Sequence, residues 1–409
     1  MQLYDKDLLS MQEVRELVEA AKEAQQELAN MTQSQVDHIV RAIADAGVRN
    51  ARRLAEMANE DTGFGKVEDK IIKNIFGSRG VYEYIKDMKT VGELERDDVK
   101  KVRTIAVPMG VIAGLVPSTN PTSTTLYKAE IAIKAGNAIV FSPHPTALRC
   151  ILETVKVIRQ AIAEAGGNEN LVSCITIPTM EATDNLMHHR DVAMILATGG
   201  SAMVRAAYSS GTPAIGVGPG NGPAYLEKTC DLPLAVKRIL DSKTFDNGTI
   251  CASEQSIICD EDMAPAVQAE MEKQGAYFLD DAEREKLGKF ILRANGTMNP
   301  EIVGRSVETI AKLAGLDKVP ASARVLVARE DGVGRGHPYS NEKLGPILAF
   351  YTGRDYKDVC DKVCTILRYE GAGHTFSMHT KDDEMVDYFA KREPASRFMV
   401  YTPSAPGGI

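Results

Sequence analysis

The sequence of 409 residues is 44% hydrophobic and 25% charged, and its formal net charge is −8. This composition is typical of a globular chain long enough for two domains, and the acidic balance with scattered Lys and Arg argues against a nucleic-acid surface. Seven cysteines in a long chain with no signal-peptide pattern predict reduced thiols in a cytoplasm, and every apolar run is too short to span a membrane.

The first ninety residues predict a helical scaffold without a ligand. Apolar residues recur at helical spacing behind two candidate capping boxes, Ser10 with Glu13 and Thr32 with Gln35. The segment D-T-G-F-G at 61–65 breaks this pattern, and a third helix is expected after it.

From 90 to 106 the pattern becomes β-like and charged, which predicts a two-stranded hairpin that needs a partner sheet for stability. Short apolar runs then alternate with helical segments, as in a parallel sheet covered on both faces. Strands are expected at 111–116, 138–141, 171–177 and 192–197, and helices at 122–135, 146–165, 179–189 and 201–209.

Ligands of such a sheet bind at the carboxyl ends of the strands, so the loops at 117–121, 142–146 and 198–201 are candidate ligand loops. A second alternation of strands and helices occupies 254–392. We therefore expect two closely packed domains, 1–226 and 227–409.

Cys251 follows a polar turn in the stretch S-K-T-F-D-N-G-T-I-C-A-S-E-Q-S and precedes the apolar run 257–259. Turn residues before a cysteine indicate partial exposure of the thiol. A reactive thiol needs such exposure and surroundings that favour the thiolate. A small core residue at the start of a strand fits the same spacing.

Asn120 follows the strand at 111–116 and precedes a helix, so its amide can donate to an oxyanion or cap the helix. The turn Thr198-Gly199-Gly200-Ser201 ends the fourth strand and opens a helix. Its glycines would let the backbone approach a pyrophosphate at the helix N-terminus. Ordinary turn glycines explain the same pattern.

Cys360 and Cys364 lie four residues apart, which is a spacing that metal ligands use. Apolar residues at helical spacing around them, Val359 and Val363 among these, instead predict a helix that faces the core. We interpret both as core cysteines and expect no metal site.

The segment F-D-N-G-x-x-C-A-S-E-Q resembles the nucleophile segment of CoA-acylating aldehyde dehydrogenases, and the similarity spans nearly the whole chain. The resemblance implies an α/β fold of two doubly wound domains: a dinucleotide-binding domain at 1–226, whose hairpin at 90–106 pairs subunits, and a catalytic domain at 227–409. It also implies that Cys251 attacks an aldehyde carbonyl, and that Asn120 and the Cys251 backbone N–H bind the oxyanion.

His374, in E-G-A-G-H-T-F-S-M-H, matches the general base that the acylating enzymes use toward CoA, and its ordinary pKa range suits that role near neutrality. A histidine that only caps a strand fits the same pattern.

The resemblance further implies NAD as the dinucleotide, with NADP left open because the acidic residue that discriminates the two is absent. Ser142 stands at the lysine position and Pro145 at the glutamate position of hydrolytic relatives. Glu342, in N-E-K-L-G-P, matches the glutamate that holds the nicotinamide ribose, although the sequence alone predicts a solvated charge there and a core leucine after it. The implied dinucleotide contacts are Pro117, Ser118, Thr119, Ser142, Pro143, Thr198, Gly199, Gly200, Ser201, Gly218, Glu342 and Leu344.

Val217 occupies an informative position in this resemblance. Hydrolytic relatives carry a glutamate that activates water four residues before the lysine of G-K-S-P, a motif that aligns with 220–223 here. Valine cannot deprotonate water, so the acyl-enzyme should persist until a thiol arrives.

The predicted reaction is therefore aldehyde, CoA and NAD to acyl-CoA and NADH, with acetaldehyde favoured. The alternatives are acylating succinate-semialdehyde or sulfoacetaldehyde dehydrogenases, a hydrolytic aldehyde dehydrogenase, and an inactive scaffold subunit. We expect a homodimer or higher homo-oligomer in the cytoplasm, or in a bacterial microcompartment, without nucleic acid or membrane partners. Relatives continue beyond the segment 402–409, so we also expect a truncated C-terminus.

Overall fold

The computed structural model describes residues 5–293 and 296–407, so the last two residues of the 402–409 segment lie outside the described part. The chain divides into unit 1, Met1–Gly63 with Val67–Val217, and unit 2, Phe64–Lys66 with Gly218–Ile409. This division comes earlier than the expected boundary at 226/227. The reason is that strand β8 (Gly222–Leu226) pairs with strands β9 and β13 of unit 2.

Unit 1 contains a five-stranded parallel sheet in the order β5-β4-β3-β6-β7. The strands are β3 (Val111–Val116), β4 (Ala138–Pro143), β5 (Val172–Cys174), β6 (Val192–Thr198) and β7 (Ala214–Val217). Strands β3 and β4 are buried along their whole length, as continuous apolar runs in a parallel sheet require. The four predicted strands are confirmed, whereas β7, an edge strand with alternating burial, was not predicted.

The helices of unit 1 that follow its strands agree with the predicted segments. They are α6 (Pro121–Lys134), α7 (Leu148–Glu164), α8 (Met180–Met187) and α9 (Ser201–Ser209). The opening scaffold comprises α1 (Lys6–Leu28), α2 (Gln33–Arg49), α3 (Ala51–Thr62), α4 (Val67–Ile75), the π-helix η1 (Phe76–Gly80) and α5 (Val81–Ile85).

The two predicted capping boxes have different outcomes. Thr32 and Gln35 form a capping box at the start of α2, as predicted. The box at Ser10 and Glu13 is wrong, because α1 already begins at Lys6 with Asp5 as its N-cap. The Ser10 hydroxyl instead lies 2.7 Å from the hydroxyl of Thr179, which is the N-cap residue of α8. This contact links α1 to α8.

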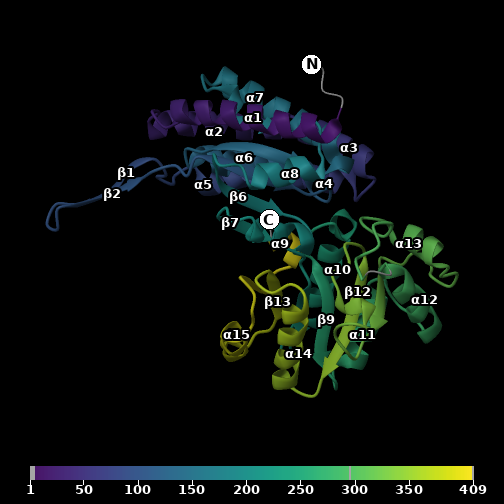
Figure 1. The fold of residues 1–409 in the computed structure, drawn as a ribbon. Coiled ribbons are helices and arrows are strands. Elements are labelled where there is room, and N and C mark those ends of the chain that lie inside the picture. The colour runs from purple at the N-terminus through teal and green to yellow at the C-terminus, as the bar shows by residue number, and fades with distance from the viewer. Residues whose placement is uncertain (1–4, 294–295, 408–409) are drawn as a thin grey trace. The chain divides into compact units, whose positions relative to one another are not determined.

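The predicted hairpin is confirmed as a separate two-stranded antiparallel sheet of β1 (Gly92–Asp97) and β2 (Val102–Ala106), which projects from unit 1 (Figure 1). It leaves Val102 53% and Ile105 59% exposed. Its role in pairing subunits stays a prediction.

Unit 2 contains a seven-stranded parallel sheet in the order β10-β11-β12-β9-β8-β13-β14. Besides β8, the strands are β9 (Glu254–Asp260), β10 (Ala276–Phe278), β11 (Val325–Arg329), β12 (Ile347–Gly353), β13 (Thr375–His379) and β14 (Arg397–Val400). The helices are α10 (Leu232–Thr244), α11 (Ala264–Lys273), α12 (Asp281–Ile291), α13 (Val307–Ala314), α14 (Tyr356–Tyr369), α15 (Asp383–Ala390) and α16 (Ser404–Gly407).

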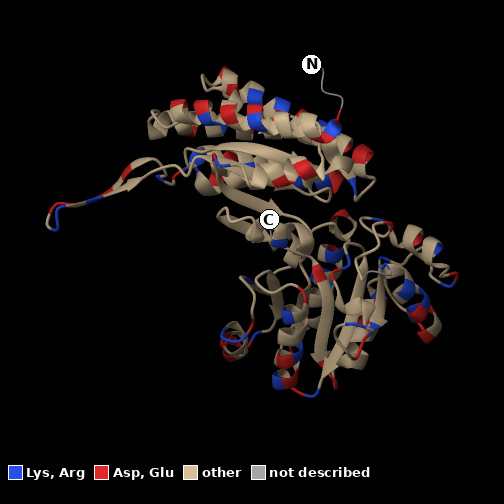
Figure 2. Ribbon diagram, in the orientation of Figure 1, with Lys and Arg blue, Asp and Glu red and all other residues tan. Residues whose placement is uncertain are grey.

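Charged residues of both signs alternate over the helices, while the strands of both sheets carry few of them (Figure 2). Among the described helices, none combines the length and the apolar character that crossing a bilayer requires.

Helix α6 buries three ionisable side chains, Lys128, Glu130 and Lys134, and the first two have different surroundings. Lys128 Nζ donates to the carbonyl oxygens of Leu115 and Leu196, both at 2.8 Å. Glu130 is 0% exposed, and within the described chain neither of its carboxyl oxygens has a hydrogen-bond partner. Burial therefore raises the pKa of Glu130 to about 10.

We predict that Glu130→Gln stabilises the protein at alkaline pH. The folded chain keeps a proton on Glu130 that the unfolded chain loses, so wild-type stability is fully present below the ordinary pKa of 4.5 and falls as pH rises toward about 10. A neutral amide removes this dependence and should raise stability at pH 8 by about 2 kcal/mol. Thermal unfolding from pH 5 to 9 measures it, with the exposed Glu23→Gln as control. Equal pH slopes for wild type and Glu130→Gln would contradict the prediction.

Candidate active site

Three predicted site residues of unit 2 each come just before a strand of its sheet. Cys251 precedes β9, Glu342 precedes β12 and His374 precedes β13. The strands β12-β9-β8-β13 are consecutive neighbours and all parallel, so their amino ends lie along one edge of the sheet. The sheet order therefore brings Cys251, Glu342 and His374 to the same edge.

Gly220, just before β8, is the common neighbour of these three residues. A Cβ atom at this position would lie 1.8 Å from the Cys251 carbonyl oxygen and 3.1 Å from Cε1 of His374. The Gly220 N–H donates to Glu342 Oε1 at 2.7 Å. Only glycine fits this close approach. Gly220 was not predicted as a site residue, because its segment served only to align Val217.

The turn before Cys251 adopts a backbone that few residues tolerate. Asp246 and Asn247 have φ of 49° and 50°, in the left-handed region, and Gly248 has φ of 76°. Asp and Asn are the side chains best suited to this region. The Asp246 carboxylate accepts from the Lys66 N–H at 2.7 Å and the Asn247 amide donates to the Gly304 carbonyl at 3.0 Å. These bonds hold the turn that the sequence D-N-G predicted.

Two of the seven cysteines, Cys230 and Cys251, are partly exposed, and the other five are buried. Cys251 is partly exposed, in agreement with the predicted exposure, and all seven cysteines, which the structure describes, are outside disulfides. Burial is the first cause that raises the pKa of each of the other six thiols, including Cys259, where it reaches about 12. The neutral thiol is therefore favoured at those six positions, which makes them poor nucleophiles.

His374 is a half-buried, neutral imidazole whose Nε2 atom is buried. Its Nδ1 lies 2.9 Å from the Thr375 hydroxyl, and its Nε2 has no hydrogen-bond partner among the described residues. Burial, with Arg397 as a smaller cause, lowers the pKa of His374 to about 4. The expectation of a pKa near neutrality is therefore wrong, although the neutral ring still carries a lone pair for a proton.

Glu342 is only 8% exposed, so the solvated charge that the sequence alone predicted is wrong. Its backbone N–H donates to Glu370 Oε2 at 2.6 Å. Burial is the main cause that raises the pKa of Glu342 to about 8. Leu344 is buried as well, as a core position requires.

Unit 1 presents its predicted residues at the carboxyl ends of its strands. Asn120 follows β3 and takes the N-cap position of α6, but its side chain makes no capping hydrogen bond. Instead Asn120 Oδ1 accepts from Lys73 Nζ at 2.7 Å, and its Nδ2 donates to the Thr119 hydroxyl at 3.2 Å. The amide is thus not used as a helix cap. Pro117 and Ser118, in the same loop, are partly exposed.

The turn between β6 and α9 fits a dinucleotide phosphate. Gly200 is the N-cap of α9, a helix of 9 residues, and a Cβ at Gly200 would meet nothing within 4 Å. The Gly199 and Ser201 backbone flanks this open space, which suits an anion at the helix N-terminus. Thr198 is the last residue of β6.

Ser142 fits its expected ribose contact poorly. It is 5% exposed within β4, and its hydroxyl lies 2.8 Å from the Thr183 hydroxyl. Pro143, the last residue of the strand, is buried as well. A direct bond from the Ser142 hydroxyl to a ribose therefore requires this internal pair to open.

Val217 and Gly218 mark the passage from unit 1 to unit 2. Val217 is 42% exposed at the end of β7, and its carbonyl accepts from the Gly199 N–H at 3.3 Å. Its side chain has no group that takes a proton. A Cβ at Gly218 would meet nothing within 4 Å.

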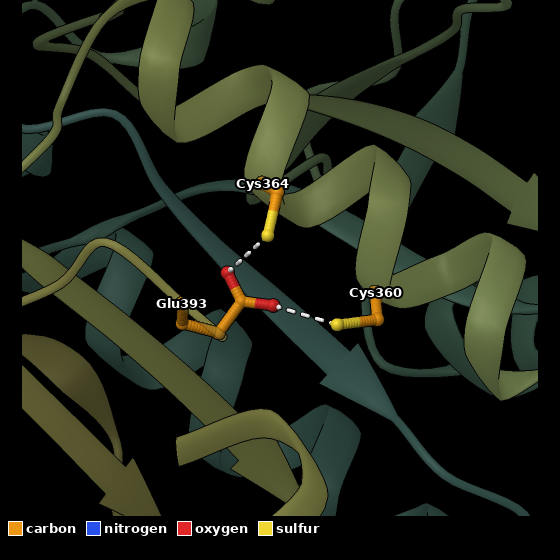
Figure 3. Close-up of side chains that lie close together, drawn as sticks. All are labelled: Cys360, Cys364 and Glu393. Atoms are coloured by element: carbon orange, nitrogen blue, oxygen red, sulfur yellow. Dashed lines mark hydrogen bonds between the residues drawn. The ribbon is translucent and has the colours of Figure 1, made fainter. Parts of the chain in front are cut away.

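Cys360 and Cys364 are buried on α14, as predicted for core positions, and both thiols point to one carboxylate (Figure 3). The Cys360 and Cys364 sulfurs lie 3.4 Å and 3.7 Å from the two carboxylate oxygens of Glu393. Burial raises the pKa of Glu393 to about 7. The sequence pattern did not indicate this carboxylate, which comes from the loop after α15.

Residues 4–298 match the model of the aldehyde dehydrogenase family. The bifunctional aldehyde-alcohol dehydrogenase of Escherichia coli is 44% identical over 400 residues, which cover 97% of this chain and 45% of that protein. The chain thus spans about half the length of such curated relatives.

Solved structures are similar over nearly the whole chain. A probable aldehyde dehydrogenase from Listeria monocytogenes has 62% identity and a TM-score of 0.97, covering 99% of this chain and 89% of its own. An acetylating aldehyde dehydrogenase from Geobacillus thermoglucosidasius has 48% identity and a TM-score of 0.96, covering 100% and 90%.

A propionaldehyde dehydrogenase from Rhodopseudomonas palustris, solved with bound CoA and an acylated cysteine, has 31% identity and a TM-score of 0.85, covering 96% of this chain and 89% of its own. The family model covers well over half of the chain, and the similar solved structures agree with this assignment. The chain belongs to the aldehyde dehydrogenase family.

Proposed function

We propose that this chain is a CoA-acylating aldehyde dehydrogenase, which converts an aldehyde, CoA and NAD into an acyl-CoA and NADH. The observation that carries the proposal is the arrangement around Gly220, where a partly exposed Cys251 and a half-buried neutral His374 approach the same glycine. Acetaldehyde is the proposed substrate, because one similar structure is named an acetylating enzyme.

In the first half-reaction the Cys251 sulfur adds to the aldehyde carbonyl, and the carbonyl oxygen becomes an oxyanion. The Asn120 amide and the Cys251 backbone N–H are the proposed donors to that oxygen, and one such donor contributes about 3–4 kcal/mol to acyl chemistry. NAD, held at the β6–α9 turn and Glu342, supplies the hydride acceptor when bound. The remaining acyl group is a thioester on Cys251.

In the second half-reaction a thiol attacks the Cys251 thioester. His374 Nε2, which lacks a protein partner in the described chain, is the proposed acceptor of the thiol proton. The product, the acyl-CoA thioester, then leaves, and the Cys251 thiolate is restored. An acylated cysteine beside bound CoA in the Rhodopseudomonas palustris structure supports this order.

Two rival functions make different predictions. A hydrolytic aldehyde dehydrogenase needs a group that activates water, and Val217 provides none at the aligned position. An inactive scaffold subunit would not need the left-handed backbone of Asp246 and Asn247 before Cys251. It would also not need Gly220, whose missing Cβ leaves room for the Cys251 carbonyl.

The cellular setting and assembly belong to the same proposal. We propose that the protein acts in the cytoplasm, because none of the described cysteines is in a disulfide. We also propose that the protein forms a homo-oligomer. The β1–β2 hairpin exposes apolar residues and lies outside the two larger sheets.

The first prediction concerns the nucleophile. Cys251→Ala should abolish CoA-dependent NADH formation, a loss of more than about 10³-fold, because only the sulfur forms the covalent bond. Folding and NAD binding should persist, as measured by thermal unfolding and fluorescence titration. Cys259→Ala, in the buried strand β9, is the matched control and should keep most of the activity. Substantial turnover by Cys251→Ala would show that the proposed function is wrong.

The second prediction concerns the acyl acceptor. Without CoA, aldehyde and NAD should give a single-turnover burst of NADH, because nothing at Val217 activates water. Rapid mixing measures the burst amplitude against the enzyme concentration, and added CoA should restore steady turnover. Steady formation of free acid at the CoA-dependent rate would instead favour the hydrolytic alternative.

The third prediction concerns His374. His374→Ala should leave the hydride burst intact and slow acyl transfer to CoA by about 10²–10⁴-fold. Since the pKa of His374 is about 4, the wild-type ring is neutral at every pH above 5, so its titration should not appear in the transfer rate near pH 7. The transfer rate of the variant should rise with pH as more CoA thiolate forms.

His188→Ala, at the exposed end of α8, is the control for this variant. If His374 only caps a strand, both half-reactions should weaken equally in a less stable protein. Equal losses in the burst and in acyl transfer would therefore remove His374 from the mechanism.

A further inference from the structure

We propose that Lys73 is a positioning residue, which orients the Asn120 amide so that one of its N–H bonds is left for a ligand oxygen. The proposal rests on the proposed function, because it assigns a role toward the Asn120 donor. Lys73 lies on α4 and is only 5% exposed. Its Nζ is 2.7 Å from Asn120 Oδ1.

The chemistry of the two groups fixes the direction of the amide. An amide has an acceptor end and a donor end, and an ammonium group can only donate. The oxygen of Asn120 must therefore face Lys73, and the NH₂ group must point away from it. One of the two N–H bonds reaches the Thr119 hydroxyl at 3.2 Å, so the amide retains a second donor for a ligand.

The same contact explains why Asn120 does not cap its helix. An N-cap asparagine normally accepts an N–H from the first turn through its side-chain oxygen. Here that oxygen is bonded to Lys73, and Pro121 begins α6 without an N–H. The residue is thus placed like a cap, while its side chain is available for another function.

A cation behind the amide also strengthens the donor in front. A charge-assisted hydrogen bond to Oδ1 draws electron density from the amide nitrogen and polarises its N–H bonds. This polarisation would stabilise a developing oxyanion more than a neutral carbonyl oxygen. Lys73 would therefore act on the transition state without touching the substrate.

A neighbouring contact supplies a structural comparison. Asn74, next to Lys73 on α4, accepts from the Thr122 hydroxyl at 2.7 Å, and both residues are buried. The pair joins the same two helices, α4 and α6, two residues beyond Asn120. Thr122→Val removes this bond without altering the amide.

The test is a double-mutant cycle on the hydride burst. Lys73→Met removes the ammonium and lets the amide rotate, so the burst rate should fall about ten- to hundredfold with little change in the aldehyde concentration that gives half the maximal rate. In an Asn120→Ala background the same substitution should not lower the burst rate further, because the amide that Lys73 orients is absent. Thr122→Val should lower the Tm and leave the burst rate unchanged.

Other outcomes would overturn the inference. Equal losses from Lys73→Met with and without the Asn120 amide would show a structural role, as would an unchanged burst in folded Lys73→Met. Lys73→Gln is the second variant if Lys73→Met does not fold, and the same coupling is expected. An unchanged burst in Asn120→Ala would overturn the inference while leaving the Cys251 chemistry intact. Activity in Cys251→Ala would instead overturn the proposed function.

Discussion

The parallel order of the strands β12-β9-β8-β13 is the constraint on which the site in unit 2 depends. Glu342, Gly220, Cys251 and His374 are far apart in the sequence, and each stands just before one of these strands. A change in strand order would separate them, because parallel neighbours share their amino ends only when they are adjacent. Unit 1 uses the opposite edge of its sheet, where Asn120 and the β6–α9 turn follow the strands.

Close backbone contacts then fix the backbone around Cys251 with little room for adjustment. A Cβ at Gly220 would collide with the Cys251 carbonyl, and the left-handed residues Asp246 and Asn247 hold the preceding turn through partly buried hydrogen bonds. Backbone of this kind persists only where surrounding contacts determine it fully. We infer that the turn limits the positions that the sulfur can take, which is what attack on a carbonyl requires.

The parts of this molecule that were predictable from sequence are those set by local patterns. The strand at 111–116 was predicted because a parallel strand buried on both faces must be an apolar run. The exposed edge strand β7 has no such run and was missed. Likewise, D-N-G indicated a turn, while nothing in the sequence indicated that Gly220 would approach Cys251 or that α4 would bring Lys73 to Asn120.

Burial was harder to predict than position. Glu342 was placed by resemblance, but its burial depends on contacts with Gly220 and Glu370, which lie far along the chain. His374 was expected to titrate near neutrality, and its lowered pKa also results from residues packed around it. Such values follow from tertiary packing, which spacing in the sequence does not reveal.

These two shifts bear on the choice between thiol and water as the acyl acceptor. The pKa of His374 is about 4 and that of Glu342 about 8, so both groups are neutral at pH 7. A neutral imidazole with so low a pKa is a weak base. It can assist a thiol, whose pKa is about 8.5, far more readily than water, whose pKa is about 15.7. The lowered pKa of His374 therefore suits a thiol better than water as the proposed acyl acceptor.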